Sequence, residues 1–324
     1  MADAISMGEL LIDFVPVTTS TDLLTATAFH KAAGGAPANV AVGLARLGVS
    51  SALMGKAGED GFGRFLVKTL TDDGVDVSLL RRSRATRTPL AFVSLAEDAE
   101  REFLFYGDIS AGFCRDDVDF KAIEQARLIH FGSIGLIPEP SRIATLLAVD
   151  AARGKRLHVS FDANLRLDLW PTADAAREAI RDGIERATIV KLSEEELEFL
   201  TNMTDPAEGV RLLLHPGLKL VVVTHGKAGC TFVTPEAHGL VPGFKVQPVD
   251  TTGAGDAFVA GLLAGVLEDD GPLTPERLTA MCRFANAAGA LATTKRGAIP
   301  GLPTRAEVDE LVRTSSAPKT SEVA

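Results

Sequence analysis

The most informative segment of the chain is Asp250-Thr251-Thr252-Gly253-Ala254-Gly255-Asp256-Ala257-Phe258, which stands directly before the apolar run Ala257–Leu267. Gly253 and Gly255 let the backbone turn sharply and approach a ligand closely. The apolar run predicts a helix, whose free N–H groups and dipole favour an anion at its start. A phosphate bound there would repel Asp256. This residue is therefore either a general base beside a phosphoryl group or an acid that stabilises the first helical turn.

A second glycine pair stands near the N-terminus, in Gly34-Gly35-Ala36-Pro37-Ala38-Asn39, and the segment continues to Gly48. Pro near the start and Gly48 after the end predict a helix over Pro37–Leu47. Asn39, one turn into this helix, offers a donor and an acceptor to a polyol. The same small residues could also serve only a tightly packed loop and helix.

Short apolar runs alternate with amphipathic segments along the chain, which predicts an α/β core with a mainly parallel sheet. The predicted strands are Ile5–Val15, Ala52–Ala57, Arg127–Ser133, Leu157–Asp162, Ile189–Leu192 and Leu218–Thr224. Further helices are predicted over Phe62–Leu70 and Thr172–Ala187, from Thr274-Pro275, and from the capping box Thr304-x-x-Glu307.

One region lacks this alternation, because Leu90–Leu95 and Glu102–Tyr106 are strand-like with no helix between them. They predict a β-hairpin with an aromatic side formed by Phe92, Phe103 and Phe105. That side needs a cover, which a small separate sheet acting as a lid or a dimer surface would provide. A hairpin at the edge of the main sheet is the alternative.

Composition limits the possible functions. The 324 residues include 33 Lys and Arg against 43 Asp and Glu, a net charge of −10, which gives no general attraction for nucleic acid or anionic membranes. Three scattered cysteines and the lack of Lys or Arg before Lys31 predict a cytoplasmic protein without a signal peptide. The sequence contains no P-loop motif, no Gly-x-Gly-x-x-Gly after a strand, no His-x-x-x-His pair and no Gly-x-Ser-x-Gly.

Together, the segments at 34–48 and 250–258 resemble the two signature motifs of the ribokinase-like (PfkB) carbohydrate kinase family. The stretches Gly8–Phe14, Glu100–Tyr106 and Asp162–Arg166 are most similar to those of fructokinases. The resemblance implies a ribokinase-like α/β fold over residues 1–313, with a mainly parallel central sheet flanked by helices. It also implies a small β-sheet lid formed from about residues 13–33 and 88–110. We expect the polar tail 314–324 to be disordered.

The resemblance implies that the protein phosphorylates a primary hydroxyl of a sugar with ATP, with fructose as the expected sugar. Asp256 would be the general base, and the backbone N–H groups of Gly253, Ala254 and Gly255 would form the anion hole. The implied sugar contacts are Asp13, Gly34, Gly35, Asn39, Arg166 and Asp256 itself.

The resemblance also implies sites for the nucleotide and for cations. The nucleotide positions are Lys191, Ser193, Thr224, Gly226, Gly229, Gly255 and Asn286. Glu196 would act on Mg²⁺ through water, although Ser193-x-x-Glu196 also has the spacing of a capping box. A monovalent cation such as K⁺ would be held near Asp250, Thr252, Ala292 and Gly297.

One stretch departs from the fructokinase pattern. After Tyr106 the chain reads Gly107-Asp108-Ile109-Ser110-Ala111-Gly112, where fructokinases usually have Arg, Pro and a closing Asp. This departure leaves the identity of the sugar open. The alternatives are a kinase for 2-dehydro-3-deoxygluconate and a non-catalytic binding protein of the same fold. The apolar side of the predicted lid also suggests a homodimer.

Overall fold

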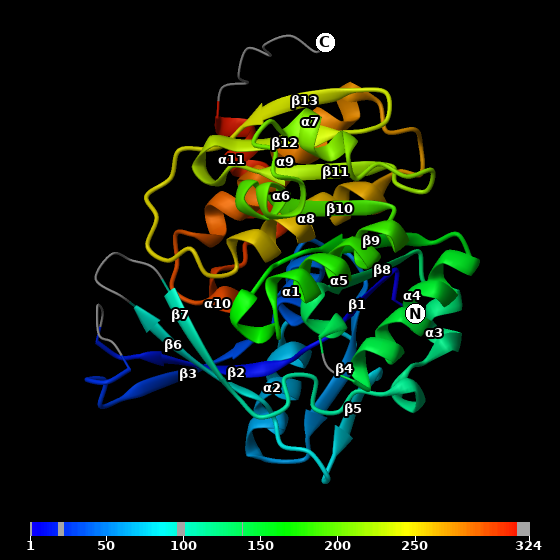
Figure 1. Ribbon diagram of the computed structural model, residues 1–324. Coiled ribbons are helices and arrows are strands. Elements are labelled where there is room, and N and C mark those ends of the chain that lie inside the picture. The colour runs from blue at the N-terminus through cyan, green and yellow to red at the C-terminus, as the bar shows by residue number, and fades with distance from the viewer. Residues whose placement is uncertain (1, 19–22, 96–100, 138, 316–324) are drawn as a thin grey trace.

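The computed structural model describes residues 2–18, 23–95, 101–137 and 139–315, and two β-sheets form its framework (Figure 1). The larger sheet has nine strands in the order β13-β12-β11-β10-β9-β8-β1-β4-β5. Its strands are β1 (Ala4–Met7), β4 (Ser51–Gly58), β5 (Leu80–Ser83), β8 (Leu128–Gly132), β9 (His158–Asp162), β10 (Ile189–Ser193), β11 (Leu220–Thr224), β12 (Gly229–Val233) and β13 (His238–Pro242).

The larger sheet is parallel from β5 to β11, and only β12 and β13 pair antiparallel. The prediction of a mainly parallel sheet is therefore confirmed. Because parallel strands end at the same edge, the residues that end β9, β10 and β11 lie side by side. These are Asp162, Ser193 and Thr224.

Helices cover both faces of the larger sheet (Figure 1). Their bounds are α1 (Ala36–Arg46), α2 (Gly61–Asp72), α3 (Phe120–Gln125), α4 (Ser141–Gly154), α5 (Ala173–Arg186), α6 (Glu194–Thr201), α7 (Pro206–Arg211), α8 (Ala254–Glu268), α9 (Pro275–Ala292), α10 (Ala298–Gly301) and α11 (Arg305–Thr314). Four short 3₁₀ helices lie at Arg115–Asp117, Ser133–Leu136, Leu167–Leu169 and Gly226–Ala228. The predicted capping box opens α11, which runs through Thr314, so the chain stays ordered slightly beyond the predicted boundary at 313. Residues 316–324 of the expected disordered tail lie outside the described residues.

The smaller sheet has the order β3-β2-β6-β7, formed by β2 (Leu11–Pro16), β3 (Phe29–Gly34), β6 (Leu90–Leu95) and β7 (Arg101–Tyr106). The hairpin thus belongs to a separate sheet and is not an edge of the main one. The single strand predicted over Ile5–Val15 is wrong. Its apolar run is continuous in sequence, but Gly8, with a φ of +146°, marks the point where the chain leaves the large sheet for the small one.

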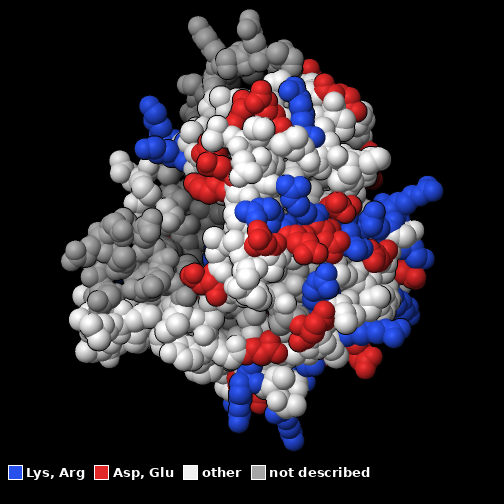
Figure 2. All heavy atoms as spheres, in the orientation of Figure 1, with Lys and Arg blue, Asp and Glu red and all other residues white. Residues whose placement is uncertain are grey.

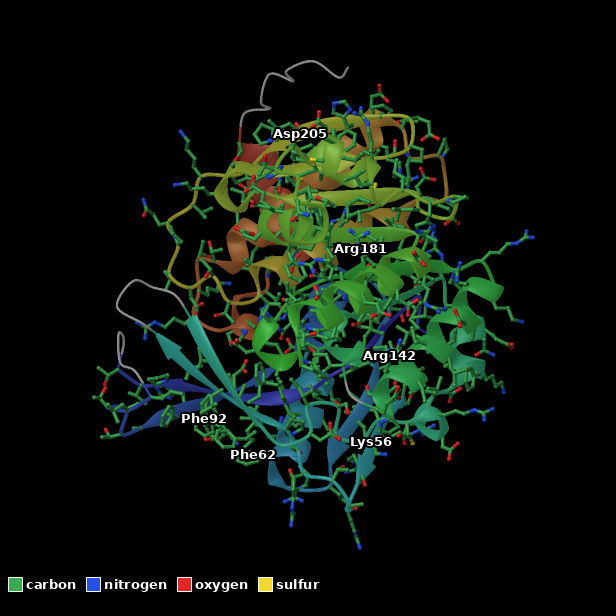
Figure 3. The ribbon with its side chains drawn as sticks, in the orientation of Figure 1. Lys56, Phe62, Phe92, Arg142, Arg181 and Asp205 are labelled. Carbon is green, nitrogen blue, oxygen red and sulfur yellow. The ribbon has the colours of Figure 1, made fainter. Side chains whose placement is uncertain are left out.

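The predicted aromatic side of the hairpin is also wrong. Phe92 pairs with Leu104, so it lies on the face opposite to Phe105. On this outer face Phe92 stacks on Phe14 with a centroid distance of 5.0 Å, close to Phe62 of α2 (Figure 3). Phe105 instead packs with Leu11 and Ile134 on the inner face. The side chain of Phe103 lies outside the described residues.

Across the described ranges, no helix is long and apolar enough to cross a membrane. On the face shown in Figure 2, acidic and basic side chains are interspersed over the described surface.

Candidate active site

A cavity of about 680 Å³ lies where the small sheet faces the carboxyl ends of β9 and β10 and the start of α8. Crevices outside the carboxyl ends of parallel strands are the usual ligand sites of open α/β sheets. Eleven of the predicted site residues line it: Asp13, Gly35, Asn39, Arg166, Lys191, Ser193, Glu196, Thr252, Gly253, Gly255 and Asp256. The structure therefore brings the two glycine-containing segments, far apart in sequence, to one cavity.

Asp256 lies in the first turn of α8, which begins after Gly253 in the left-handed conformation, with a φ of +78°. A Cβ at Gly253 would stand 2.9 Å from Ala298 Cα, so the turn excludes any side chain. Asn39 Nδ2 donates a hydrogen bond to Asp256 Oδ2 at 2.8 Å. Desolvation raises the pKa of Asp256 to about 6, against the effects of this hydrogen bond and of Lys191 and Arg166. Asp256 is thus a base suited to near-neutral pH.

The wall beside Asp256 comes from β2 and the start of α1. Asp13 in β2 lines the cavity, and a Cβ at Gly34 would overlap its carboxylate, so glycine at 34 makes room for Asp13. Gly35 has a φ of +104°, and a Cβ there would stand 2.5 Å from the carbonyl oxygen of Glu9. Carboxylate and amide groups in this wall can hold the hydroxyl groups of a polyol.

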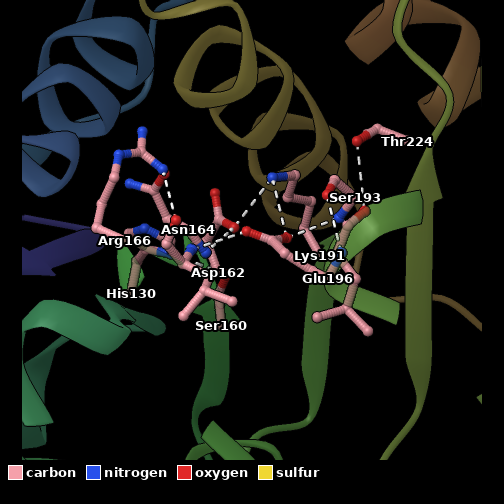
Figure 4. A network of polar contacts seen from close by, with 11 residues as sticks. His130, Ser160, Asp162, Asn164, Arg166, Lys191, Ser193, Glu196 and Thr224 are labelled. Carbon is pink, nitrogen blue, oxygen red and sulfur yellow. Dashed lines mark hydrogen bonds and ion pairs between the residues drawn. The ribbon is translucent and has the colours of Figure 1, made fainter. Parts of the chain in front are cut away.

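A buried polar network lies beneath the cavity (Figure 4). Lys191 Nζ lies 3.1 Å from Asp162 Oδ1 and 3.8 Å from Glu196 Oε2. Burial alone would lower the pKa of Lys191, but the two carboxylates raise it above its ordinary value, so the ammonium stays charged. Lys191 Nζ is also 3.8 Å from the point where a Cβ of Gly255 would lie. A fixed positive charge therefore stands beside the predicted anion hole.

Glu196 is held in place by backbone groups. Its Oε2 accepts a hydrogen bond from Ser193 N at 2.7 Å, and its Oε1 accepts one from Leu165 N at 2.8 Å. The capping-box interpretation of Ser193 and Glu196 is therefore correct. Each carboxylate oxygen keeps a further lone pair, which suits contact with a metal ion through water. Within the described part of the chain, no group of three or more His, Cys, Asp or Glu side chains could bind a metal by itself.

The four other nucleotide positions lie outside the lining of this cavity: Thr224, Gly226, Gly229 and Asn286. Asn286 is buried, and its Nδ2 donates to the carbonyl oxygens of Val241 and Pro242 at 3.0 and 3.3 Å. This amide fixes α9 to β13. A Cβ at Gly229 would overlap the carbonyl oxygen of Val241. Both residues thus have structural reasons for their identity, and their predicted contacts with a nucleotide stay predictions.

The predicted cation residues converge on one corner behind α8. Asp250 Oδ1 accepts from Thr252 N at 2.8 Å, and Asp250 Oδ2 accepts from Gly297 N at 2.9 Å. The Asp250 N–H donates to the carbonyl of Thr293, the residue after Ala292 at the end of α9. Carboxylate and main-chain oxygens of this kind suit a hard monovalent or divalent cation.

Comparisons with known proteins agree with this geometry. Residues 1–305 match the pfkB family of carbohydrate kinases. The chain belongs to this family. It is 51% identical over 311 residues to the protein named probable fructokinase-6, chloroplastic, of Arabidopsis thaliana. The aligned region covers 94% of this chain and 81% of that protein.

Solved structures of pfkB kinases have the same fold. The fructokinase of Xylella fastidiosa with bound ATP is 33% identical, with a TM-score of 0.88 over 97% of this chain and 99% of that one. A double mutant of the fructokinase from Vibrio cholerae, with fructose, ADP and potassium bound, is 34% identical, with a TM-score of 0.87 over 96% of this chain and 98% of that one. The predicted family, fold and carbohydrate kinase activity are confirmed.

Three acidic residues that line this pfkB site, Glu9, Asp162 and Glu195, had no predicted role. Glu9 is buried and lines the cavity, and Asp162 pairs with Lys191. The position of Asp162 at the end of a predicted parallel strand was the signal that could have identified it. Glu9 gave no such signal, because it stood inside a run that predicted one continuous strand.

Residues 107–112, which depart from the fructokinase pattern, do not line the cavity. Ile109 packs with Leu11 and Ile134 one layer behind it. Asp108 Oδ1 accepts from the N–H and hydroxyl of Ser110 at 3.0 and 2.7 Å, which makes a local turn. The stretch therefore forms the base of the small sheet and places no charge in the site.

Proposed function

We propose that this chain transfers the γ-phosphoryl group of ATP to a primary hydroxyl group of fructose. The observation that carries this proposal is the position of Asp256, which lies at the N-terminus of α8, accepts a hydrogen bond from Asn39 and lines the same cavity as Asp13. The fructokinases with bound ATP and with bound fructose and ADP have the same fold over nearly the whole chain. In this cavity a polar wall suits the hydroxyl groups of a sugar, and a helix N-terminus suits a phosphate group.

Asp256 would take the proton from the attacking hydroxyl group. A carboxylate with a pKa of about 6 is largely ionised at neutral pH, yet basic enough to accept a proton in the transition state. The N–H groups of Gly253, Ala254 and Gly255 would stabilise the charge that develops on the phosphoryl oxygens. Lys191 and Arg166 would add positive charge from the other side. The small sheet would close over the sugar and exclude water, which favours transfer to the sugar over hydrolysis of ATP.

The charges of the cavity favour a neutral sugar over a sugar acid. Glu9, Asp13 and Asp256 line the cavity, and the cations that line it among the described residues are Arg166 and Lys191, of which Lys191 is already paired with Asp162 and Glu196. A keto acid such as 2-dehydro-3-deoxygluconate would bring a further carboxylate close to these acids. Such like-charge contacts cost several kcal/mol unless another cation compensates them.

Two cations complete the proposal. Mg²⁺ bound to the ATP phosphates would neutralise part of their charge. It would keep several bound water molecules, one of which could donate a hydrogen bond to Glu196. The corner formed by Asp250, Thr252, Ala292 and Gly297 would hold a monovalent cation behind α8. Potassium is bound in the Vibrio cholerae fructokinase, which supports this second assignment.

The oligomeric state and the cellular compartment are also proposals. We infer a homodimer formed through the outer face of the small sheet, where Leu104 and Tyr106 are 47% and 53% exposed. We propose a cytoplasmic location, which the three free cysteines support. The Arabidopsis relative is named chloroplastic, which is a property of that protein.

The test is initial-rate phosphorylation with ATP and Mg²⁺ over fructose, ribose, glucose, 2-dehydro-3-deoxygluconate and adenosine. We expect the highest kcat/KM for fructose. A preference for the keto acid would overturn the sugar assignment and leave the kinase mechanism. No turnover with any of the five, in a folded protein that binds ATP, would favour the non-catalytic alternative.

A further inference from the structure

The segment 163–166 connects the end of β9 to the 3₁₀ helix Leu167–Leu169 and has no regular secondary structure. Asn164, Leu165 and Arg166 of this segment line the cavity. Asn164 has a φ of +35°, in the left-handed region, which a residue with a side chain keeps only where surrounding contacts hold it. The conformation of the segment therefore depends on its neighbours.

Two buried carboxylates in the polar network of Figure 4 hold the backbone of this segment. Asp162 Oδ1 accepts a hydrogen bond from Asn164 N at 3.1 Å, and Glu196 Oε1 accepts one from Leu165 N at 2.8 Å. The carbonyl oxygen of Leu165 in turn accepts a hydrogen bond from Arg166 Nη1 at 3.0 Å. The guanidinium group of Arg166 is thus connected to both carboxylates through the backbone at 164 and 165.

Lys191 fixes the carboxylate of Asp162. Its Nζ donates a hydrogen bond at 3.1 Å to the same Oδ1 that accepts from Asn164 N. Replacing a buried ion pair by apolar side chains of similar size is often neutral or stabilising, so stability alone is a weak reason for such a pair. This pair lies in the lining of the cavity and contacts the segment that carries Arg166. Both observations point to a role in placing that cation.

We propose that Asp162 is a positioning residue for phosphoryl transfer, which holds the segment 163–166 so that Arg166 stays in the cavity. The inference rests on the proposed function, in which Arg166 adds positive charge for the transferred phosphoryl group. Asp162→Asn keeps the Oδ1 acceptor and removes the negative charge, whereas Asp162→Ala removes both. If Asp162 only stabilised the fold, its loss would act independently of Arg166.

The test is a double-mutant cycle of Asp162→Ala and Arg166→Ala, with kcat for fructose measured at saturating ATP and Mg²⁺. Each single variant should lower kcat by about tenfold or more, because a misplaced or missing cation no longer stabilises the transition state. The double variant should stay within about threefold of Arg166→Ala, since the two changes remove the same interaction. Asp162→Asn should stay within about threefold of the wild type, because it keeps the hydrogen-bond acceptor.

Three outcomes would overturn the inference. Losses that multiply to about hundredfold or more in the double variant would mean that Asp162 acts on something other than Arg166. An Asp162→Asn protein as slow as Asp162→Ala would mean that the charge matters and the hydrogen bond does not. The third outcome is an Asp162→Ala protein with the kcat of the wild type. Melting temperatures show whether each variant is folded, and Asp162→Leu, an apolar group of similar size, replaces Asp162→Ala in the cycle if that variant does not fold.

Asp117→Ala is the matched control. Asp117 Oδ2 lies 2.8 Å from Lys56 Nζ and accepts a hydrogen bond from Cys114 N at 2.9 Å, so Asp117 has the same two kinds of partner as Asp162. It does not line the cavity. Asp117→Ala should lower the melting temperature and leave kcat for fructose unchanged. Equal losses of kcat in Asp117→Ala and Asp162→Ala would contradict a specific role of Asp162.

Failure of the proposed function is visible in the wild type alone. A wild type that phosphorylates another sugar of the panel and not fructose would refute the substrate assignment, and the cycle is then measured with that sugar. A wild type without turnover on any of them would refute the proposed function and the inference that rests on it. An active wild type whose losses multiply would overturn only the inference.

Discussion

The proposed role of Asp256 requires a single carboxylate to stand beside an anion site and act as a base. It lies in the first helical turn, where an acid is favourable to the helix, and its hydrogen bond from Asn39 fixes one oxygen at 2.8 Å. The residue also lines the cavity. Desolvation holds its pKa near 6, so the group is ionised over most of the neutral range.

We predict that Asp256→Asn lowers kcat for sugar phosphorylation by about 10²–10⁴, the usual share of general-base catalysis. Nucleotide affinity should change little, because the backbone N–H groups at 253–255 are kept. In the wild type, kcat should fall as the pH drops below about 6, since protonation removes the base. Initial rates from pH 5 to 8 and calorimetric binding of ADP check these outcomes. Near-normal activity of a folded Asp256→Asn protein would reject the base assignment.

The residues with chemical roles differed in how far the sequence could identify them. Asp256 and Asn39 stand in motifs, and both line the cavity as expected. Asn286 has the same kind of side chain, but its contacts with Val241 and Pro242 depend on how α9 packs on β13. Glu9 was hidden in an apolar run. Sequence motifs therefore predicted the cavity residues that lie within the motifs themselves. They did not predict residues whose contacts come from segments far away in the sequence.

At the scale of the elements, α8 begins after the left-handed Gly253, which lines the cavity together with Gly255 and Asp256. We predict that Gly253→Ala lowers the free energy of unfolding by about 1–2 kcal/mol from the conformation alone, with a further loss from contact with Ala298. Its kcat should fall about tenfold or more, because the anion hole moves. Chemical denaturation and initial rates measure both effects.

Gly154→Ala is the matched control for this prediction. Gly154 ends α4, and an added Cβ there would meet no atom within 4 Å. The change should leave activity unaltered and alter the free energy of unfolding by no more than about 0.5 kcal/mol. If both variants behaved alike, the start of α8 would not have the role assigned to it.

Element prediction from the sequence succeeded where one segment forms one element. The helices at 36–46 and 61–72 and the strands at 128–132 and 189–193 lie within a few residues of their predicted bounds. It failed at Ile5–Val15, because the division into β1 and β2 follows from the presence of two sheets and not from hydrophobicity. Phe92 and Phe105 likewise lie on opposite faces of the small sheet because of the register between β6 and β7. The positions of aromatic residues in the sequence do not reveal this register.

At the scale of the whole molecule, the outer face of the small sheet is an apolar surface that stays partly exposed in the single chain. Phe92 packs edge-to-face with Phe29 and Tyr106, at centroid distances of 5.4 and 5.6 Å, and Leu104 lies directly opposite it in β7. Leu104 and Tyr106 are nevertheless 47% and 53% exposed. A contiguous aromatic and apolar face of this kind is typical of an interface between protein surfaces.

We predict that the wild type is a dimer and that Leu104→Glu shifts it to monomers, because a charge buried without a partner opposes association. Sedimentation velocity at several concentrations measures the change. Leu240→Glu is the control, since Leu240 is 53% exposed in β13, at the other end of the molecule (Figure 1), and should leave the dimer intact. A wild type that is monomeric at every concentration would contradict the dimer. If the dimer persisted in Leu104→Glu and dissociated in Leu240→Glu, the interface would lie at β13 and not at the small sheet.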